Sequence, residues 1–120
     1  MSVEAPSEVE APEAARKRRP VDAPKEPRQM PRYVVIVEND DFHSFPYVID
    51  VLRTVCGHDR ARAYRLTNQV HFRGQAAVWT GPLEHAELKR DQIRRFGPDH
   101  FASEPVTFPL GVRIEPLPAG

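Results

Sequence analysis

The chain has 120 residues, and its 17 basic and 17 acidic side chains give a formal net charge of zero. This neutral balance provides no general attraction to nucleic acid or to an anionic membrane, so we expect neither as a partner. No apolar run approaches the roughly 20 residues that a membrane span needs, and the N-terminus lacks the apolar centre of a signal peptide, so the expected location is cytoplasmic.

Residues 1–31 are predicted to be a disordered tail. They hold six of the 13 prolines and no aromatic residue. Their charges fall into an acidic block that ends at Glu13 and a basic block over residues 16–19. Such a segment has too little apolar surface to offset an ordering entropy of about 1–2 kcal/mol per residue. The basic cluster, Arg16 to Arg19, fits a solvated charge block better than a targeting or nucleic-acid patch. Residues 32–120 are left for one small folded domain.

The first predicted elements are a strand and a helix that flank an acidic turn. The β-branched run over residues 34–37 predicts a buried strand over 32–38, which ends in Asn39-Asp40-Asp41. Ser44 is a candidate N-cap for a helix that Gly57 stops, with Pro46 tolerated in its first turn. The helix carries apolar residues at helical spacing: Phe45, Val48, Ile49, Leu52 and Val55. The turn is therefore held between two ordered elements and can fix acceptors for a cation.

The lone cysteine, Cys56, excludes an internal disulfide. It falls at the end of this apolar helix face, so we interpret it as a packing residue. Nothing beside it in the sequence would obviously lower its pKa, which argues against a nucleophilic or redox role.

A second helix is predicted between the N-cap candidate Asp59 and Gly74. Its buried side carries Ala63, Leu66, Thr67 and Val70. Residues 75–80 suit a second strand, which would include Trp79 as a sheet core residue.

A third, strongly charged helix is expected over residues 82–96, with Pro82 at its first position and Gly97-Pro98 as its stop. Its core stripe is predicted to be Leu83, Ala86, Ile93 and Phe96. Residues 97–107 are expected to be irregular, and residues 111–115 alternate as a last strand. The order of elements predicts a small α+β domain, with a three-stranded, mainly antiparallel sheet covered on one face by three helices.

Three stretches together resemble the ClpS family of adaptors for the ATP-dependent Clp protease. They are Val-Ile-Val-Glu-Asn-Asp-Asp-Phe at 35–42, Tyr-Val-Ile-Asp-Val-Leu at 47–52, and Ala63 through Val70-His71-Phe72-Arg73-Gly74. A weaker resemblance continues to residue 115. The resemblance as a whole implies the order of strands and helices predicted above, and a non-enzymatic adaptor without cofactor or metal. Such an adaptor binds proteins that begin with a bulky hydrophobic residue, the N-degron substrates, and delivers them to a ClpA-like or ClpC-like AAA+ unfoldase.

The resemblance assigns the substrate's α-amino group to Asn39, Asp40, Asp41 and His71. The chemistry of these residues agrees, because an α-amino group is a cation at neutral pH and needs several acceptors around it. The side chain of the first substrate residue is assigned by the resemblance to an apolar pocket made of His43, Phe45, Val48, Thr67, Val70 and Leu110.

This pocket departs from the usual pattern of the family. Methionine is common at the positions of Phe45 and Thr67, and threonine or a similar small residue at the position of His43. Phenylalanine is stiffer and bulkier than methionine, so we expect a pocket of different shape and altered preference. The resemblance also suggests Glu84, Glu87 and Lys89 as the neighbourhood that docks on the unfoldase.

Two other functions compete with this interpretation. Asp40, Asp41, His43 and His71 are all possible metal ligands, but they lack compact ligand spacing and no nucleophile motif accompanies them. The stronger rival is an interaction module of the same fold that binds another protein and has altered or lost recognition of the substrate's first residue.

Overall fold

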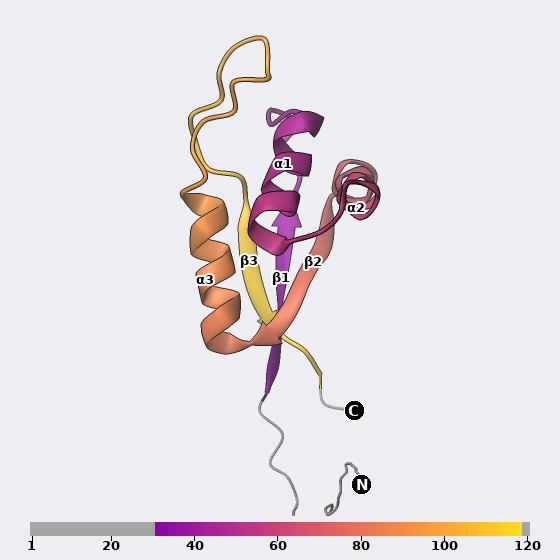
Figure 1. Ribbon diagram of the computed structural model, residues 1–120, viewed down its shortest axis with the longest axis vertical. Coiled ribbons are helices and arrows are strands. Elements are labelled where there is room, and N and C mark those ends of the chain that lie inside the picture. Colours follow the sequence, from indigo (N-terminus) through magenta and orange to yellow (C-terminus); the bar gives the residue numbers. More distant parts are fainter. Residues whose placement is uncertain (1–30, 119–120) are drawn as a thin grey trace, which may run out of the picture. The chain divides into compact units, whose positions relative to one another are not determined.

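The computed structural model describes residues 31–118. The predicted disordered tail, residues 1–31, lies outside the described residues except for Pro31. The described elements follow the predicted order (Figure 1): β1 (Arg32–Glu38), α1 (Phe45–Cys56), α2 (Arg60–Arg73), β2 (Gln75–Pro82), α3 (Leu83–Arg94) and β3 (Val112–Pro116).

The three strands form one antiparallel sheet in the order β2-β1-β3. The helices lie over one face of this sheet (Figure 1), where Val35 and Val37 of the central strand are completely buried in the main core cluster. The opposite face carries polar pairing: Arg113 of β3 donates to Gln75 of β2 and forms an ion pair with Glu38 of β1. The predicted α+β class is confirmed.

The first two helices begin and end where their capping residues predict. The Ser44 hydroxyl accepts a hydrogen bond from the Tyr47 N–H at 3.3 Å, and the Asp59 carboxylate accepts one from the Arg62 N–H at 2.8 Å. Gly57 and Gly74 end the helices with φ of 75° and 89°, a left-handed conformation that glycine adopts without a Cβ penalty. Local sequence signals therefore fix this helical hairpin.

The predicted boundaries of the last three elements, β2, α3 and β3, were wrong by one or two residues at several ends. Strand β2 is two residues longer than predicted and runs through Gly81 to Pro82, because it pairs with the start of β1. Pro82 is consequently the N-cap of α3, which ends at Arg94, before Gly97. Gly81 leaves room for the Trp79 ring, since a Cβ there would lie 2.3 Å from that ring and would displace it. Strand β3 begins at Val112 and continues to Pro116.

The core stripe of α3 is also narrower than predicted. Ala86 and Ile93 are completely buried, but Leu83 is 38% exposed. Phe96 lies beyond the end of the helix, where its ring packs edge-on against Tyr47 with a centroid separation of 5.7 Å. Trp79 is half-buried rather than central to the core, and the Lys89 ammonium lies 5.8 Å from its ring centroid.

The segment predicted to be irregular, residues 97–107, contains one isolated bridge. The N–H and carbonyl groups of Asp99 and Val106 exchange hydrogen bonds of 2.8 and 3.0 Å. None of the helices within residues 31–118 combines the length and the apolar character that a membrane crossing requires.

Candidate functional site

The end of β1 is clamped from both sides by backbone hydrogen bonds. The Glu38 N–H donates to the Gly111 carbonyl at 2.9 Å, and the Asn39 N–H donates to the Gly74 carbonyl, also at 2.9 Å. Gly74 caps the helix whose last turn carries His71, and Gly111 follows Leu110. The two bonds therefore bring the acidic turn, the end of α2 and the segment before β3 to one end of the sheet.

The acidic turn is internally ordered. The Asn39 side-chain amide donates to the Asp41 carboxylate at 2.9 Å, and the Asp41 N–H contacts the Asn39 amide oxygen only weakly, at 3.4 Å. Asp41 has φ of 67°, a left-handed conformation that is uncommon for a non-glycine residue and often marks functional sites. The Asn39 amide nitrogen is thus used within the turn, while its oxygen keeps capacity to accept a hydrogen bond from a cation.

Both carboxylate oxygens of Asp40 make contacts within the turn itself. One of its carboxylate oxygens accepts hydrogen bonds from the N–H groups of Phe42 and His43 at 2.9 and 3.0 Å. The other contacts the Nδ1 atom of His43. Asp40 therefore supplies negative charge to the turn and holds its shape.

The ring of His43, which the resemblance assigns to the pocket wall, is held by contacts within the protein. Its side chain is only 2% exposed, and both ring nitrogens face acceptors: Nδ1 faces Asp40, and Nε2 lies 3.0 Å from the Phe108 carbonyl. The face of the ring stacks on Tyr47 at a centroid distance of 5.1 Å. His43 thus ties the acidic turn to the segment before β3.

Four of the predicted pocket residues are buried side chains from three segments: Val48 of α1, Thr67 and Val70 of α2, and Leu110. Phe45 is half-buried, and its ring meets the ring of His71 edge to face at 5.3 Å. The Thr67 hydroxyl donates to the Ala63 carbonyl at 2.8 Å, so its hydrogen-bonding demand is met within α2. Phe45 thus links the assigned pocket residues to His71.

Comparison with known proteins identifies the family of this chain. The family model described as ATP-dependent Clp protease adaptor protein ClpS matches residues 28–111. This chain belongs to the ClpS family. Its members are protease adaptors that act in protein degradation, and the resemblance noted in the sequence is confirmed.

Curated ClpS adapters from other organisms are similar to this chain. The chain is 53% identical to the Synechocystis sp. protein over 68 residues, which are 56% of this chain and 69% of that one. It is 52% identical to the Nostoc sp. protein over 68 residues, 56% of this chain and 70% of the relative. Among solved structures, Agrobacterium tumefaciens ClpS2 bound to L-phenylalaninamide is similar with a TM-score of 0.63 and 27% identity, over 74% of this chain and all of that one.

One residue of this ClpS chain that supports the site was missed from the sequence. Asp99 is completely buried, and its carboxylate accepts hydrogen bonds from the Ser44 N–H at 2.6 Å, the Ser44 hydroxyl at 3.1 Å and the Phe101 N–H at 2.9 Å. Burial alone would raise the pKa of Asp99, but these hydrogen bonds outweigh it and lower the pKa below its usual value. Asp99 thereby fixes the start of α1 against the segment that leads to Leu110.

The residues suggested for docking on the unfoldase differ in their surroundings. Glu84 is exposed at the start of α3 and Glu87 is half-buried. Lys89 is occupied within the fold, because its ammonium donates to the Val55 carbonyl at the end of α1 at 2.8 Å. Glu84 is therefore the one of the three that is most open to a partner.

Metal and thiol chemistry find little support in the described part of this ClpS chain. Within residues 31–118, no group of three or more His, Cys, Asp or Glu side chains is placed to hold a metal ion. Burial raises the pKa of the Cys56 thiol to about 11, with Lys89 opposing the shift only in part. The thiol is therefore protonated at neutral pH, and half-buried Cys56 packs against the core as predicted.

Proposed function

We propose that this ClpS chain binds the free N-terminus of proteins that begin with a bulky hydrophobic residue and delivers them to a Clp AAA+ unfoldase of the ClpA or ClpC kind. Asn39 and His71 would accept hydrogen bonds from the substrate's ammonium group, and Asp40 and Asp41 would supply negative charge. Val48, Thr67, Val70 and Leu110 would surround the first side chain, with Phe45 at its edge.

The observation that carries this proposal is the hydrogen bond from the Asn39 N–H to the Gly74 carbonyl. It joins two acceptor-bearing segments that are far apart in the sequence, next to buried apolar side chains. Charge-assisted hydrogen bonds of the kind proposed contribute about 1.5–3 kcal/mol each. The related ClpS2 was solved with L-phenylalaninamide, a ligand that has both a free α-amino group and a phenylalanine side chain.

The proposal is tested by fluorescence anisotropy with labelled peptides that begin with Phe, Leu, Tyr or Trp, each with its N-acetylated twin. We expect at least one free peptide to bind and its acetylated twin to lose most affinity, because acetylation removes the charge and the donors. Binding of the free peptide should also weaken above about pH 8, where an α-amino group loses its proton.

The same titration separates the rival function. Phe45 already packs on His71 in this structure, so an interaction module that no longer reads the first residue could use the same surface. Equal binding of free and acetylated peptides, or no binding of either, would favour that module and contradict N-terminal recognition.

A further inference from the structure

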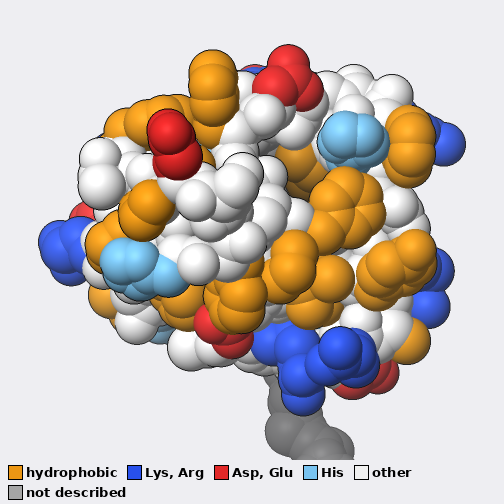
Figure 2. Space-filling view, turned by 90° about the horizontal axis from the view of Figure 1, so that it is seen from above, with side chains coloured by type: hydrophobic (Ala, Val, Ile, Leu, Met, Phe, Trp, Pro, Cys, Tyr) orange, Lys and Arg blue, Asp and Glu red, His pale blue; other side chains and the backbone are white. Residues whose placement is uncertain are grey.

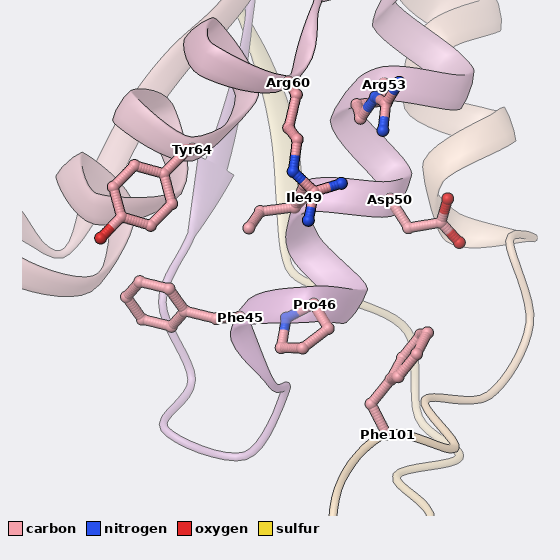
Figure 3. Close-up of a pocket in the computed structure, with 8 residues that line it drawn as sticks. All are labelled: Phe45, Pro46, Ile49, Asp50, Arg53, Arg60, Tyr64 and Phe101. Atoms are coloured by element: carbon pink, nitrogen blue, oxygen red, sulfur yellow. The ribbon is translucent and has the colours of Figure 1, made fainter.

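A cleft of about 410 Å³ opens on the outer side of α1 and α2. Figure 2 shows hydrophobic side chains gathered on this end of the molecule, with Lys and Arg side chains beside them. The apolar lining of the cleft comes from both helices and from the segment between α3 and β3 (Figure 3): Phe45, Pro46, Ile49, Tyr64 and Phe101. Its volume falls within the roughly 300–1,000 Å³ that is usual for ligand sites.

The cleft is continuous with the candidate site because Phe45 belongs to both. Its ring packs against the ring of His71, at 5.3 Å between centroids, while the residue also lines the cleft. Figure 3 shows the Phe45 and Tyr64 side chains at one end of the cleft and Phe101 at the other. A peptide whose first residue is bound beside His71 can therefore leave past Phe45 and run over the outer face of α1.

The rim of the cleft carries an excess of positive charge. Arg53 of α1 and Arg60 of α2 line it together with a single carboxylate, Asp50. In Figure 3 the Arg60 side chain extends from α2 toward α1. Within residues 31–118 neither guanidinium forms an ion pair, whereas Asp50 receives a 3.4 Å hydrogen bond from Thr54. The two arginines are thus available to an anionic group.

We propose that this cleft is a second subsite, which holds the residues that follow the first residue of the same substrate and favours an acidic side chain among them. The inference rests on the proposed N-terminal recognition and deepens it. Substrates would then be selected twice, by a hydrophobic first residue at the end of the sheet and by negative charge over α1.

The test measures the affinity of peptides that share Phe at position one and differ at positions two to four: three Glu, three Gln or three Lys. Exposed ion pairs contribute about 0.2–1 kcal/mol each, so two arginines should make the Glu peptide bind about twofold to thirtyfold tighter than the Gln peptide. The preference should shrink at high salt, which screens exposed charges.

Charge reversal gives the decisive comparison. The double variant Arg53→Glu/Arg60→Glu should invert the order and favour the Lys peptide, while the Gln peptide binds nearly as before. The matched control is Arg62→Ala, which removes an exposed arginine of α2 that does not line the cleft; it should keep the Glu preference. Thermal unfolding of each variant checks that the fold is retained.

The outcomes distinguish this inference from the proposed function. If free peptides bind more tightly than acetylated ones but the Glu, Gln and Lys peptides bind alike, the subsite is refuted and N-terminal recognition stands. A Glu preference that survives charge reversal refutes it as well. If no peptide depends on its free amino group, both proposals fail together.

Discussion

At the scale of single residues, the polar atoms of the candidate site that could bind a ligand are those without a full set of hydrogen-bond partners within the protein. The amide nitrogen of Asn39 and both ring nitrogens of His43 have partners, while the Asn39 oxygen keeps accepting capacity. Thr67 shows the same principle: its hydroxyl donates to the Ala63 carbonyl, so it is not an unpaired donor. A buried polar atom with a partner costs far less than one without.

Thr67 offers a test of pocket specificity. We expect Thr67→Val to change the affinity for a Phe-initiated peptide by less than about threefold, because the hydroxyl is not needed for the ligand. Thr67→Met should fill the pocket and shift preference from Trp or Phe toward Leu by about tenfold, since small size differences in apolar pockets contribute about 1–3 kcal/mol. Anisotropy with the four peptides measures both. A large loss with valine would mean that the hydroxyl contacts the substrate.

At the scale of elements, two partly buried polar contacts hold the two ends of helix α1 in place. Asp99 fixes the start of α1, and Lys89 of α3 reaches the end of the same helix. Both contacts join residues far apart in the sequence, with separations of 55 and 34 positions. No local pattern in the sequence indicated either contact, because each one joins segments that only the folded chain brings together.

Asp99 should make the protein sensitive to acid. Its pKa in the folded protein is lowered, so the carboxylate contributes stability above its unfolded pKa of about 3.9, and this contribution is lost as the pH falls toward the lower folded value. We expect Asp99→Asn to reduce the free energy of unfolding by about 2–3 kcal/mol at pH 7, because charged hydrogen bonds are lost. Urea denaturation at pH 7 and at pH 3 should show this gap at the higher pH and a smaller gap at the lower one.

The exposed carboxylate Glu104 of the same segment provides the control for Asp99. Glu104→Gln should leave stability nearly unchanged at both pH values. A gap for Asp99→Asn that is equally large at pH 3 would mean that packing, and not the ionised carboxylate, accounts for its effect.

Lys89 and Glu84 can be separated by measuring stability and delivery in parallel. Lys89→Met removes the hydrogen bond to the Val55 carbonyl and should lower the free energy of unfolding by about 1–2 kcal/mol. Glu84→Lys changes an exposed charge, so we expect a change within about 0.5 kcal/mol. If Glu84 contacts the unfoldase, its variant will bind the unfoldase more weakly while remaining as stable as the wild type. Unchanged stability of Lys89→Met would contradict a structural role for the ammonium group.

At the scale of the whole described domain, the sequence predicted the boundaries that neighbouring residues determine. It missed the boundaries that depend on pairing between residues far apart in the chain. Ser44, Asp59, Gly57 and Gly74 cap their helices within a few residues, so both boundaries of α1 and α2 were correct. Strand β2 extends to Pro82 because that residue pairs with Arg32, a contact that no local pattern encodes. The acidic turn was predicted from its local pattern and His71 from a family resemblance, whereas the arginine-rimmed cleft arises only when α1, α2 and the later segment meet.

We expect the folded domain to bind the substrate and residues 1–31 to serve its delivery to the unfoldase. All residues assigned to the α-amino site and its pocket lie between Asn39 and Leu110, so deleting residues 1–25 should leave the affinity for a Phe-initiated peptide within about twofold. Delivery should fall, because the composition of the tail predicts a segment that an unfoldase pore can engage where it cannot engage a folded domain.

Peptide anisotropy and degradation of a Phe-initiated reporter by the cognate unfoldase and protease measure the two activities of the same truncated protein. The matched control replaces residues 1–25 with a Gly/Ser segment of equal length, which preserves reach but removes the charge blocks. Recovery of delivery by that control would show that length suffices. Continued loss would assign a role to the acidic block or to Arg16 to Arg19, and a parallel loss of peptide affinity would contradict the division itself.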